Sequence, residues 1–355
     1  MSAILSYYNF FSSETGVIIE PPLPDFGPNG YPNPRQGVDP NTVNSPVTIG
    51  QTLIYQDWEN NNLGKDDVDT PNFVASFLSN DFDEDPPVKK GTVVDSSDPI
   101  VLDSNNFKAL KAYTEFPSQA SLNAYNDGSQ SGKRKLEKLH TRYEIVYGDG
   151  PSPYWTNGGQ GFDRFFTRLG QEFIINQRIA IGPNWEIADN KNNSGEDAYT
   201  SIFEMKQDGH TPYRNRDATY KVRVQGTDFN VIVQGATTAN QDTGDPNDYK
   251  RITRVKPPLS FFNGKFHLLT HHLLLYPDSR GFIKTYLDGQ LIYSETGPNS
   301  FWDTTDGSND ISKIDTNKGP YIKSGIYNPF WRNGVSTPGS TYEEIYMDFL
   351  TVGIP

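Results

Sequence analysis

The sequence predicts an all-β protein, an antiparallel β-sandwich of the jelly-roll type that spans residues 51–355. Aromatic residues make up 13% of the chain, with 20 Tyr and 21 Phe, and such bulky side chains pack well on the pleated surface of a sheet. With 31 Gly and 26 Pro, turns must be frequent. From Thr52 onward, short apolar or alternating segments are separated by turn residues, which is typical of a sandwich of antiparallel strands.

The expected strands follow one another with short connections. Alternation over Arg142–Tyr147 and Gln171–Ile181 favours strands with two distinct faces. Gly226-Thr227-Asp228 and Asp288-Gly289 lie between neighbouring segments and predict hairpins. The one helix that the pattern suggests lies around Ser131–Leu139. In chain order, the predicted strands are Leu53–Trp58, Asn72–Leu78, Phe107–Phe116, Arg142–Tyr147, Gln171–Ile181, Tyr199–Lys206, Thr219–Gln225, Phe229–Gln234, Lys265–Tyr276, Phe282–Leu287, Gln290–Tyr293, Tyr321–Tyr327 and Ile345–Val352.

Residues 1–50 are predicted to form a separate Pro/Gly-rich N-terminal arm. Eight prolines lie between Pro21 and Pro46, and such a segment cannot form a helix or a central strand. We therefore expect residues 18–48 to lie outside the sandwich, partly in a polyproline-like conformation. Two interpretations stay open: a flexible tail, or an arm that anchors the chain to a protein partner.

Composition excludes several classes of partner. The net charge of −13 argues against nucleic acid, because phosphate binding needs a basic surface. No stretch approaches the roughly 18 apolar residues of a membrane-spanning helix, so no membrane association is expected. The chain has no Cys, which excludes disulfides and thiolate metal sites. Residues Met1–Phe11 have neither a basic start nor a long apolar run, so no secretory signal peptide is predicted.

Alternation along three predicted strands places polar side chains on one face. In Tyr321–Tyr327 the isoleucines Ile322 and Ile326 are expected in the core. The residues expected to share the opposite, polar faces of their strands are Tyr321, Lys323, Gly325 and Tyr327, then Arg142 and Glu144, and then Thr200, Ile202, Glu204 and Lys206. Such a face is either a wet surface with cross-strand ion pairs or a binding surface.

Five segments together resemble the jelly-roll polysaccharide lyases, which include alginate lyases and proteins like heparin lyase I and glucuronan lyase with a concanavalin-like sandwich. Tyr321-Ile-Lys-Ser-Gly-Ile-Tyr-Asn328 is similar to their Tyr-x-Lys-x-Gly-x-Tyr signature. Arg142-Tyr-Glu144 is similar to the Arg-x-Glu of an earlier strand. Asn263-Gly-Lys-Phe-His267 with the hairpin Gly281–Gly289, and Glu344–Asp348 as the final strand, follow in the family's order over about residues 51–355.

The resemblance implies β-elimination on an acidic, uronate-containing polysaccharide. In these families a tyrosine transfers the proton, and here it would be Tyr327, with Lys323 on the same face. Arg142 would bind the substrate carboxylate through a bidentate contact. Glu204 and Lys206 complete the expected catalytic set. Candidate substrate-binding residues are Tyr321, Glu144, Asn328 and His210, the last in a turn beside Arg214 and Arg216.

One segment departs from the family pattern. Glu204-Met-Lys206 stands where the related alginate lyases carry a Gln-x-His pair. An ionised Glu204 would repel a uronate, so it could serve only if it is protonated or paired with Lys206 or Arg142. His271 and His272 offer no replacement, because a histidine in an apolar strand is more often a packed residue than a catalyst.

Two functions from different classes therefore stay open, a lyase and a non-catalytic carbohydrate-binding or structural module. The missing Gln-x-His, the acidic charge and the absence of a signal peptide favour the module, which would suit a component of a virus or phage particle. Location would then be extracellular or virion-associated, with the arm attached to the particle. The acidic turns Asp81–Asp85 and Asn126-Asp127-Gly128 could bind Ca²⁺, although solvated acidic turns are the commoner case. A cytoplasmic enzyme unrelated to polysaccharides is the third alternative.

Overall fold

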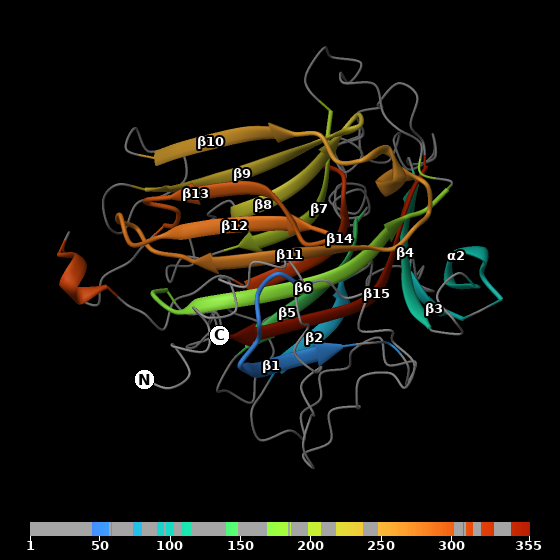
Figure 1. Ribbon diagram of the computed structural model, residues 1–355, viewed down its shortest axis with the longest axis horizontal. Coiled ribbons are helices and arrows are strands. Elements are labelled where there is room, and N and C mark those ends of the chain that lie inside the picture. Colours follow the sequence, from blue (N-terminus) through green and yellow to red (C-terminus); the bar gives the residue numbers. More distant parts are fainter. Residues whose placement is uncertain are drawn as a thin grey trace, which may run out of the picture.

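The computed structural model contains two antiparallel sheets, which confirms the predicted all-β sandwich (Figure 1). It describes residues 45–56, 58, 74–79, 91–95, 97–102, 108–115, 140–147, 169–183, 185, 198–206, 218–236, 248–301, 308, 310–314, 321–329 and 342–355. Neighbouring strands within each sheet are often distant in sequence, as a jelly roll requires.

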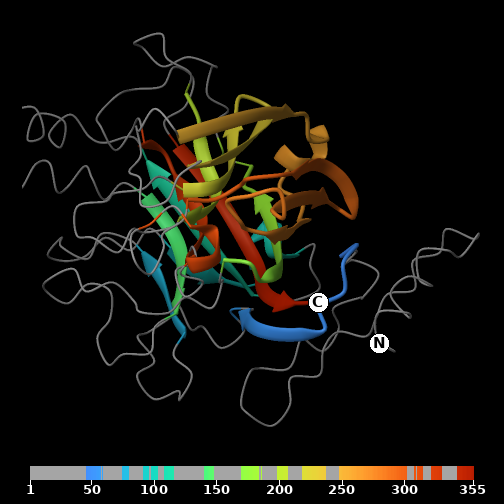
Figure 2. The same ribbon diagram turned by 90° about the vertical axis from the view of Figure 1, so that its left-hand side faces the viewer.

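The sheet that we call sheet A has eight strands, and its order is β13-β12-β11-β6-β15-β4-β3, with β1 paired to the second half of β15. Figure 2 shows β1 beside the C-terminal end of β15. The bounds are β13 Gln290–Thr296, β12 Phe282–Leu287, β11 His267–Leu274, β6 Glu172–Ile181, β15 Tyr342–Ile354, β4 Ala109–Glu115, β3 Gly91–Val94 and β1 Gln51–Gln56. A short helix, α2 (Pro99–Leu102), packs Ile100 and Val101 against Ala180 and Tyr346 on the outer face of this sheet.

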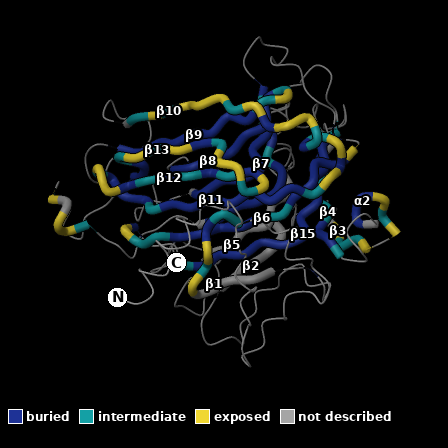
Figure 3. The backbone as a smooth tube through the Cα atoms, viewed as in Figure 1, coloured by how far each residue is buried: buried dark blue, intermediate teal, exposed yellow. Residues whose placement is uncertain are grey.

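Sheet B has seven strands in the order β10-β9-β8-β7-β14-β5-β2. The bounds are β10 Asp248–Val255, β9 Asp228–Ala236, β8 Ala218–Gln225, β7 Thr200–Lys206, β14 Tyr321–Tyr327, β5 His140–Tyr147 and β2 Val74–Ser79. Two 3-10 turns, η2 (Leu259–Phe262) and η3 (Ile311–Lys313), complete the described elements. Figure 3 shows that exposed positions gather on the edge strands β10 and β13, while the inner strands are largely buried.

The apolar core fills the space between the two sheets. Alternate residues of β6, such as Phe173 and Ile175, meet alternate residues of β8 and β14, such as Val222 and Ile326. Each fully buried aliphatic side chain contributes about 1.5–3 kcal/mol by leaving water. Ile322 and Ile326 are both completely buried, which confirms the predicted direction of β14.

A chain of polar side chains crosses this core and links the two sheets. Ser324 of β14 donates to Gln177 Oε1 of β6 at 2.6 Å, and Gln177 Nε2 lies 3.2 Å from His271 Nε2 of β11. His271 Nδ1 lies 2.8 Å from the Tyr220 hydroxyl of β8, which bonds Thr285 at 2.6 Å. Because Gln177 uses its oxygen for Ser324, its amide donates to His271, which leaves the proton on Nδ1. Burial lowers the pKa of His271 to about 3, so the ring is neutral and structural, as the sequence suggested.

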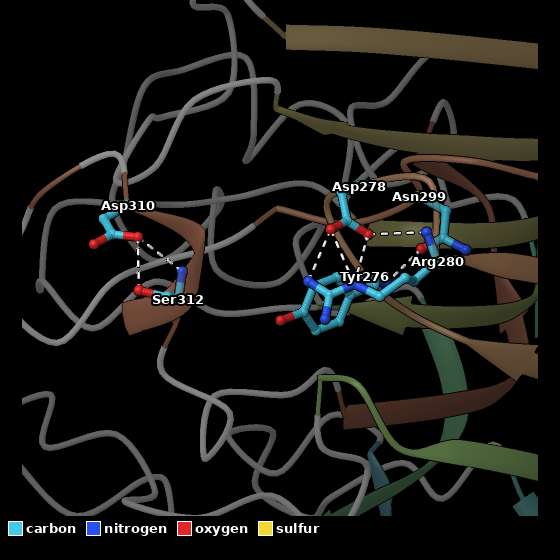
Figure 4. A network of polar contacts seen from close by, with 6 residues as sticks. All are labelled: Tyr276, Asp278, Arg280, Asn299, Asp310 and Ser312. Atoms are coloured by element: carbon cyan, nitrogen blue, oxygen red, sulfur yellow. Dashed lines mark hydrogen bonds and ion pairs between the residues drawn. The ribbon is translucent and has the colours of Figure 1, made fainter.

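The two predicted hairpins are present. Asp288 and Gly289 have φ of +49° and +79°, the left-handed pair that a type I′ turn between β12 and β13 requires. Gly226, with φ of +58°, begins the tight turn between β8 and β9, in which Asp228 pairs with Gln225. The longer connection after β11 is fixed differently (Figure 4). There Arg280 lies 3.8 Å over the Tyr276 ring and pairs with Asp278, while Asn299 accepts from the Tyr276 amide at 2.7 Å.

The structure adds elements that the sequence did not predict. Strands β3 and β10 were missed, and β10 (DYKRITRV) was overlooked because its charged residues suit an exposed edge strand, which lacks a clear apolar alternation. The predicted helix at Ser131–Leu139 lies outside the described residues. So does most of the N-terminal arm, although Val47 is buried and Ser45 donates to Asn176 of β6 at 3.2 Å. Within the described ranges, no helix has the length and apolar character to span a bilayer.

Candidate functional site

The outer face of sheet B, which points away from the core, carries a row of alternating charges. Lys323 of β14 lies directly opposite Glu144 of β5 on one side and Glu204 of β7 on the other. Glu204 in turn lies opposite Lys221 of β8. Directly paired residues of antiparallel strands point to the same face, with Cβ atoms about 5 Å apart. The row therefore places two cationic and two acidic positions side by side across four strands.

A second row lies four residues further along β14. Tyr327 is opposite Ser201 of β7, Ser201 is opposite Arg223 of β8, and Arg223 is opposite Asn230 of β9. Val222 and Val224 belong to the core, so Arg223 points outward between them. The row contains one cation and no carboxylate.

Between the two rows, sheet B is irregular. The pairing of β14 with β7 shifts between Ser324 and Tyr327, and Gly325 adopts φ of +136°, a conformation that favours glycine. The pairing of β7 with β8 also shifts, between Ser201 and Phe203. Such bulges redirect side chains and are frequent beside functional sites.

The bulge in β7 overturns one expectation from alternation. Ile202 and Thr200 were expected on the outer face with Glu204, but Ile202 lies in the core and Thr200 bonds the buried Glu343. Because one extra residue is inserted, Ser201 takes the outward direction instead. The expectation that Glu204 and Lys323 face away from the core is confirmed.

The charged residues of the first row are well covered. Lys323 is 6% exposed, Glu204 5% and Lys221 3%, and each has polar or electrostatic partners of its own. An ionised Glu204 with lysines at both paired positions is electrostatically compensated, which answers the problem that a lone carboxylate would repel a uronate. The positions directly opposite Glu204 are Lys323 and Lys221, and pairing with Lys206 or Arg142 stays a prediction.

Arg142, Glu144, Lys206 and Tyr321 are placed through the register of their strands. Arg142 lies opposite Gly325 and Lys206 lies opposite Tyr321, so all four positions fall on the same face as Lys323. Their roles, like those of Lys323 and Tyr327, stay predictions. His210, Arg214 and Arg216 lie outside the described residues.

Asn328, predicted to bind substrate, is buried and anchors the end of β14 instead of facing outward. Its Nδ2 donates to Glu343 Oε1 at 3.2 Å and lies 3.3 Å from the Thr200 hydroxyl, which itself donates to Glu343 Oε1 at 2.5 Å. Burial raises the pKa of Glu343 to about 7, and the hydrogen bonds from Thr200 and Asn328 oppose this shift. Beside these three residues is a cavity of about 10 Å³, room for about one water.

Sequence reasoning missed Lys221, Arg223, Ser201, Asn230 and Glu343. The alternation of Lys221 and Arg223 with valines was a visible signal in β8, since it predicts a cationic outer face. Ser201 could not be found, because a bulge is not readable from alternation. Glu343 was missed because it lies before the predicted final strand Ile345–Val352.

The acidic turns Asp81–Asp85 and Asn126-Asp127-Gly128, which were considered as Ca²⁺ sites, lie outside the described residues. Within the part of the chain that the structure describes, no three His, Asp or Glu side chains gather as metal ligands would. His272 bonds Glu172, and His271 bonds Tyr220 among the polar side chains that cross the core.

Comparison with known proteins gives one family and one fold. A family model described as "Polysaccharide lyase" matches residues 97–351. The structure is similar to the crystal structure of an endo-β-1,4-glucuronan lyase from the fungus Trichoderma reesei, with a TM-score of 0.52 and 11% identity over 86% of this chain and 96% of that chain. It is more distantly similar to the binding domain of botulinum neurotoxin serotype D, with a TM-score of 0.40, 9% identity, and coverage of 85% and 48%. No curated protein sequence matches the chain.

Proposed function

Because the chain belongs to the polysaccharide lyase family, we propose that it cleaves a uronate-containing polysaccharide by β-elimination on the outer face of sheet B. The observation that carries this proposal is the register of β5, β14 and β7. It brings Arg142, Glu204, Lys206, Lys323 and Tyr327 to one face, although they are widely separated in sequence. Arg142 lies opposite Gly325, two residues from Tyr327, whereas Lys206 lies opposite Tyr321, roughly 20 Å from Tyr327 along β14.

The proposed reaction needs three contributions from this face. A base removes the C5 proton, the C4–O bond breaks with its electron pair on the leaving oxygen, and a C4=C5 double bond forms while an acid protonates that oxygen. Tyr327, which is half-buried at the end of the row, is proposed as the proton-transferring group. Arg142 is proposed to hold the carboxylate next to C5, because a neutralised carboxylate makes the C5 proton more acidic.

Lys323 is proposed to stabilise the anionic intermediate through its charge. It lies on the same face as Tyr327, four positions before it in β14. Glu204 then acts on Lys323 rather than on the substrate, since the two side chains occupy directly opposed positions.

A local positive field is needed for an acidic substrate to approach a chain of net charge −13. On the outer face of sheet B, β8 carries the cationic positions Lys221 and Arg223, and β14 carries Lys323. They support an acidic polysaccharide as the partner.

The test is the absorbance of the unsaturated product during incubation with alginate, glucuronan, heparin and pectate. We expect a rise with at least one of these polymers, and loss of that rise in Tyr327→Phe. Tyr113→Phe is the matched control, because Tyr113 is equally half-buried but lies on the outer face of sheet A. No rise with any uronate polymer would contradict the proposal.

A second candidate function is a carbohydrate-binding module without catalysis. It is favoured by the buried Glu204, which stands where related alginate lyases carry an amide. In that case polymer is retained without absorbance change, and Tyr327→Phe barely alters affinity because the ring remains. An extracellular or virion-associated location, with the arm of residues 1–50 bound to a protein partner, is part of this second proposal.

A further inference from the structure

Arg223 is a buried cation that has no counter-charge within the part of the chain that the structure describes. Its side chain is 7% exposed, and its guanidinium carbon lies 3.7 Å over the ring of Tyr199. Among the described residues, no carboxylate forms an ion pair with it, and its Nε has no hydrogen-bond partner. A buried charge is costly unless it is paired, and contact with an aromatic face compensates only part of that cost.

The neighbours of Arg223 are also unsatisfied. Ser201 Oγ, directly opposite Arg223 on β7, is buried and has no partner. Asn230 donates its amide to Gln225, which leaves Asn230 Oδ1 and Gln225 Nε2 without partners. Three polar side chains around Arg223, like Arg223 itself, therefore have polar atoms without partners among the described residues, whereas buried polar groups are normally hydrogen-bonded.

The unmet groups match the chemistry of an acidic sugar. Arg223, Ser201 and Gln225 offer donors, which a carboxylate would accept, while Asn230 Oδ1 offers an acceptor for a sugar hydroxyl. The row is not closed to solvent, since Tyr199 and Tyr327 are only half-buried. In the neighbouring row, Lys323 and Lys221 alternate with carboxylates, so the uncompensated positive charge is at Arg223.

Arg223 is too far from Arg142 to share its ligand. The two residues lie on β8 and β5, three strand spacings apart across sheet B, which is roughly 14 Å. If Arg142 holds the uronate at Tyr327, Arg223 meets a different unit of an extended chain that crosses the strands.

We propose that Arg223, with Ser201, Gln225 and Asn230, forms a second carboxylate-binding subsite that holds a uronate distinct from the reacting one. The inference rests on the proposed function for the identity of the polymer as a polyuronate. It assigns to Arg223 specificity for acidic over neutral sugars, and not a part in the proton transfer.

The experiment measures binding and turnover separately in Arg223→Gln, with hexasaccharides of glucuronate and of alginate and their carboxyl-reduced counterparts as probes. Calorimetric affinity for the acidic hexasaccharide should fall at least about tenfold, the size of a lost charge-assisted hydrogen bond. Affinity for the carboxyl-reduced form should not change. If the chain is a lyase, KM should rise by a similar factor while kcat is nearly unchanged.

Two variants control the result. Arg254→Gln removes a cation from the same face, but this arginine is largely exposed and lies 3.5 Å from Asp228, so affinity should stay as in the wild type. Arg223→Lys keeps the charge without the planar fork and should recover part of the affinity.

Equal affinity of Arg223→Gln and the wild type for the acidic probe would overturn the subsite, even if elimination is observed. Loss of folding in Arg223→Gln would also overturn it, because the guanidinium would then stabilise the chain itself. Selective loss of acidic binding without any elimination by the wild type would support the subsite and refute the lyase. No binding of any acidic probe by the wild type would overturn both.

Discussion

On the outer face of sheet A, Arg178 reaches Asp348 at 2.5 Å and Lys111 reaches Glu344 at 3.0 Å. On the outer face of sheet B, the buried Arg223 lies over the ring of Tyr199 and forms no ion pair with any described residue. On the first face Thr270 bonds Asn176 and Tyr346 bonds Asp98, while Thr351 Oγ1 has no partner among the described residues. On the second face Ser201 Oγ and Asn230 Oδ1 have none.

The difference separates two kinds of polar residue. Some stabilise the sandwich through their contacts with one another, and others are available to bind a ligand. Both faces look alike in sequence, as strands with alternate charged residues. Side chains that satisfy one another contribute to stability, while buried groups without partners cost stability and persist where a ligand completes them. The contrast between the paired Arg178 and Arg223 therefore favours sheet B as the proposed binding face.

The largest effect that would break this comparison concerns turnover at Tyr327. We expect Tyr327→Phe to lower the rate of elimination by about 10²–10⁴-fold, because a positioned proton-transferring group contributes that much. Tyr113→Phe on sheet A should leave the rate of elimination within about twofold of the wild-type rate. The rate is measured from the absorbance of the unsaturated product, and equal losses in both variants would place the chemistry elsewhere.

The second comparison concerns stability, in Arg178→Met and Arg223→Met. Arg178→Met should lower the free energy of unfolding by about 3–5 kcal/mol, because Asp348, which is 1% exposed, would lose the cation that compensates it. Arg223→Met should not lower it, because no partner is left uncompensated. Urea denaturation followed by circular dichroism measures both, and a similar loss in Arg223→Met would contradict the assignment of sheet B as a binding face.

The third comparison concerns the pH dependence of stability. It involves Glu343 of sheet A, which accepts a hydrogen bond from Thr200 of sheet B. Its pKa is raised by burial to about 7 in the folded chain, so the folded state binds more protons than the unfolded state below that pH. Stability should therefore fall as pH rises from about 4.5 to about 7, by about 3 kcal/mol at most.

The variant Glu343→Gln mimics the protonated carboxyl and should flatten this profile, as measured by thermal unfolding from pH 4 to pH 8. Glu344→Gln is the adjacent control, because that carboxylate pairs with Lys111. Glu344→Gln should still lose stability as pH rises. A flat profile in the wild type would contradict the raised pKa of Glu343.

The smallest expected effect tests whether the hydrogen-bonded side chains in the core, from Ser324 to Thr285, position the outer face of sheet B. Ser324→Ala leaves Gln177 Oε1 without its donor at 2.6 Å and should cost about 1–3 kcal/mol of stability. Because Ser324 points inward between Lys323 and Gly325, binding of acidic oligosaccharides should change little. A large loss of binding at unchanged stability would mean that these hydrogen-bonded core side chains position the site.

Much of the fold was predictable because strand patterns are local. The I′ turn at Asp288-Gly289 and the direction of Ile322 and Ile326 follow from backbone conformation and alternation. Charged edge strand β10 was not predictable, since it lacks a buried face. For the site, alternation gave the direction of Lys323 and Glu204 but failed at Ile202, where the bulge inserts a residue.

The sequence by itself determined which residues alternate, and hence that Lys323, Tyr327, Glu204, Lys221 and Arg223 leave the core, because side-chain direction depends on neighbours one or two positions away. Only the tertiary structure decided which of them meet. Strand order joins β5, β14, β7 and β8, whose residues are up to about 180 positions apart, and pairing depends on long-range packing. Whether a charge finds a partner is likewise a property of the assembled sheet, and this is why Arg178 and Arg223 look the same in sequence and differ in the fold.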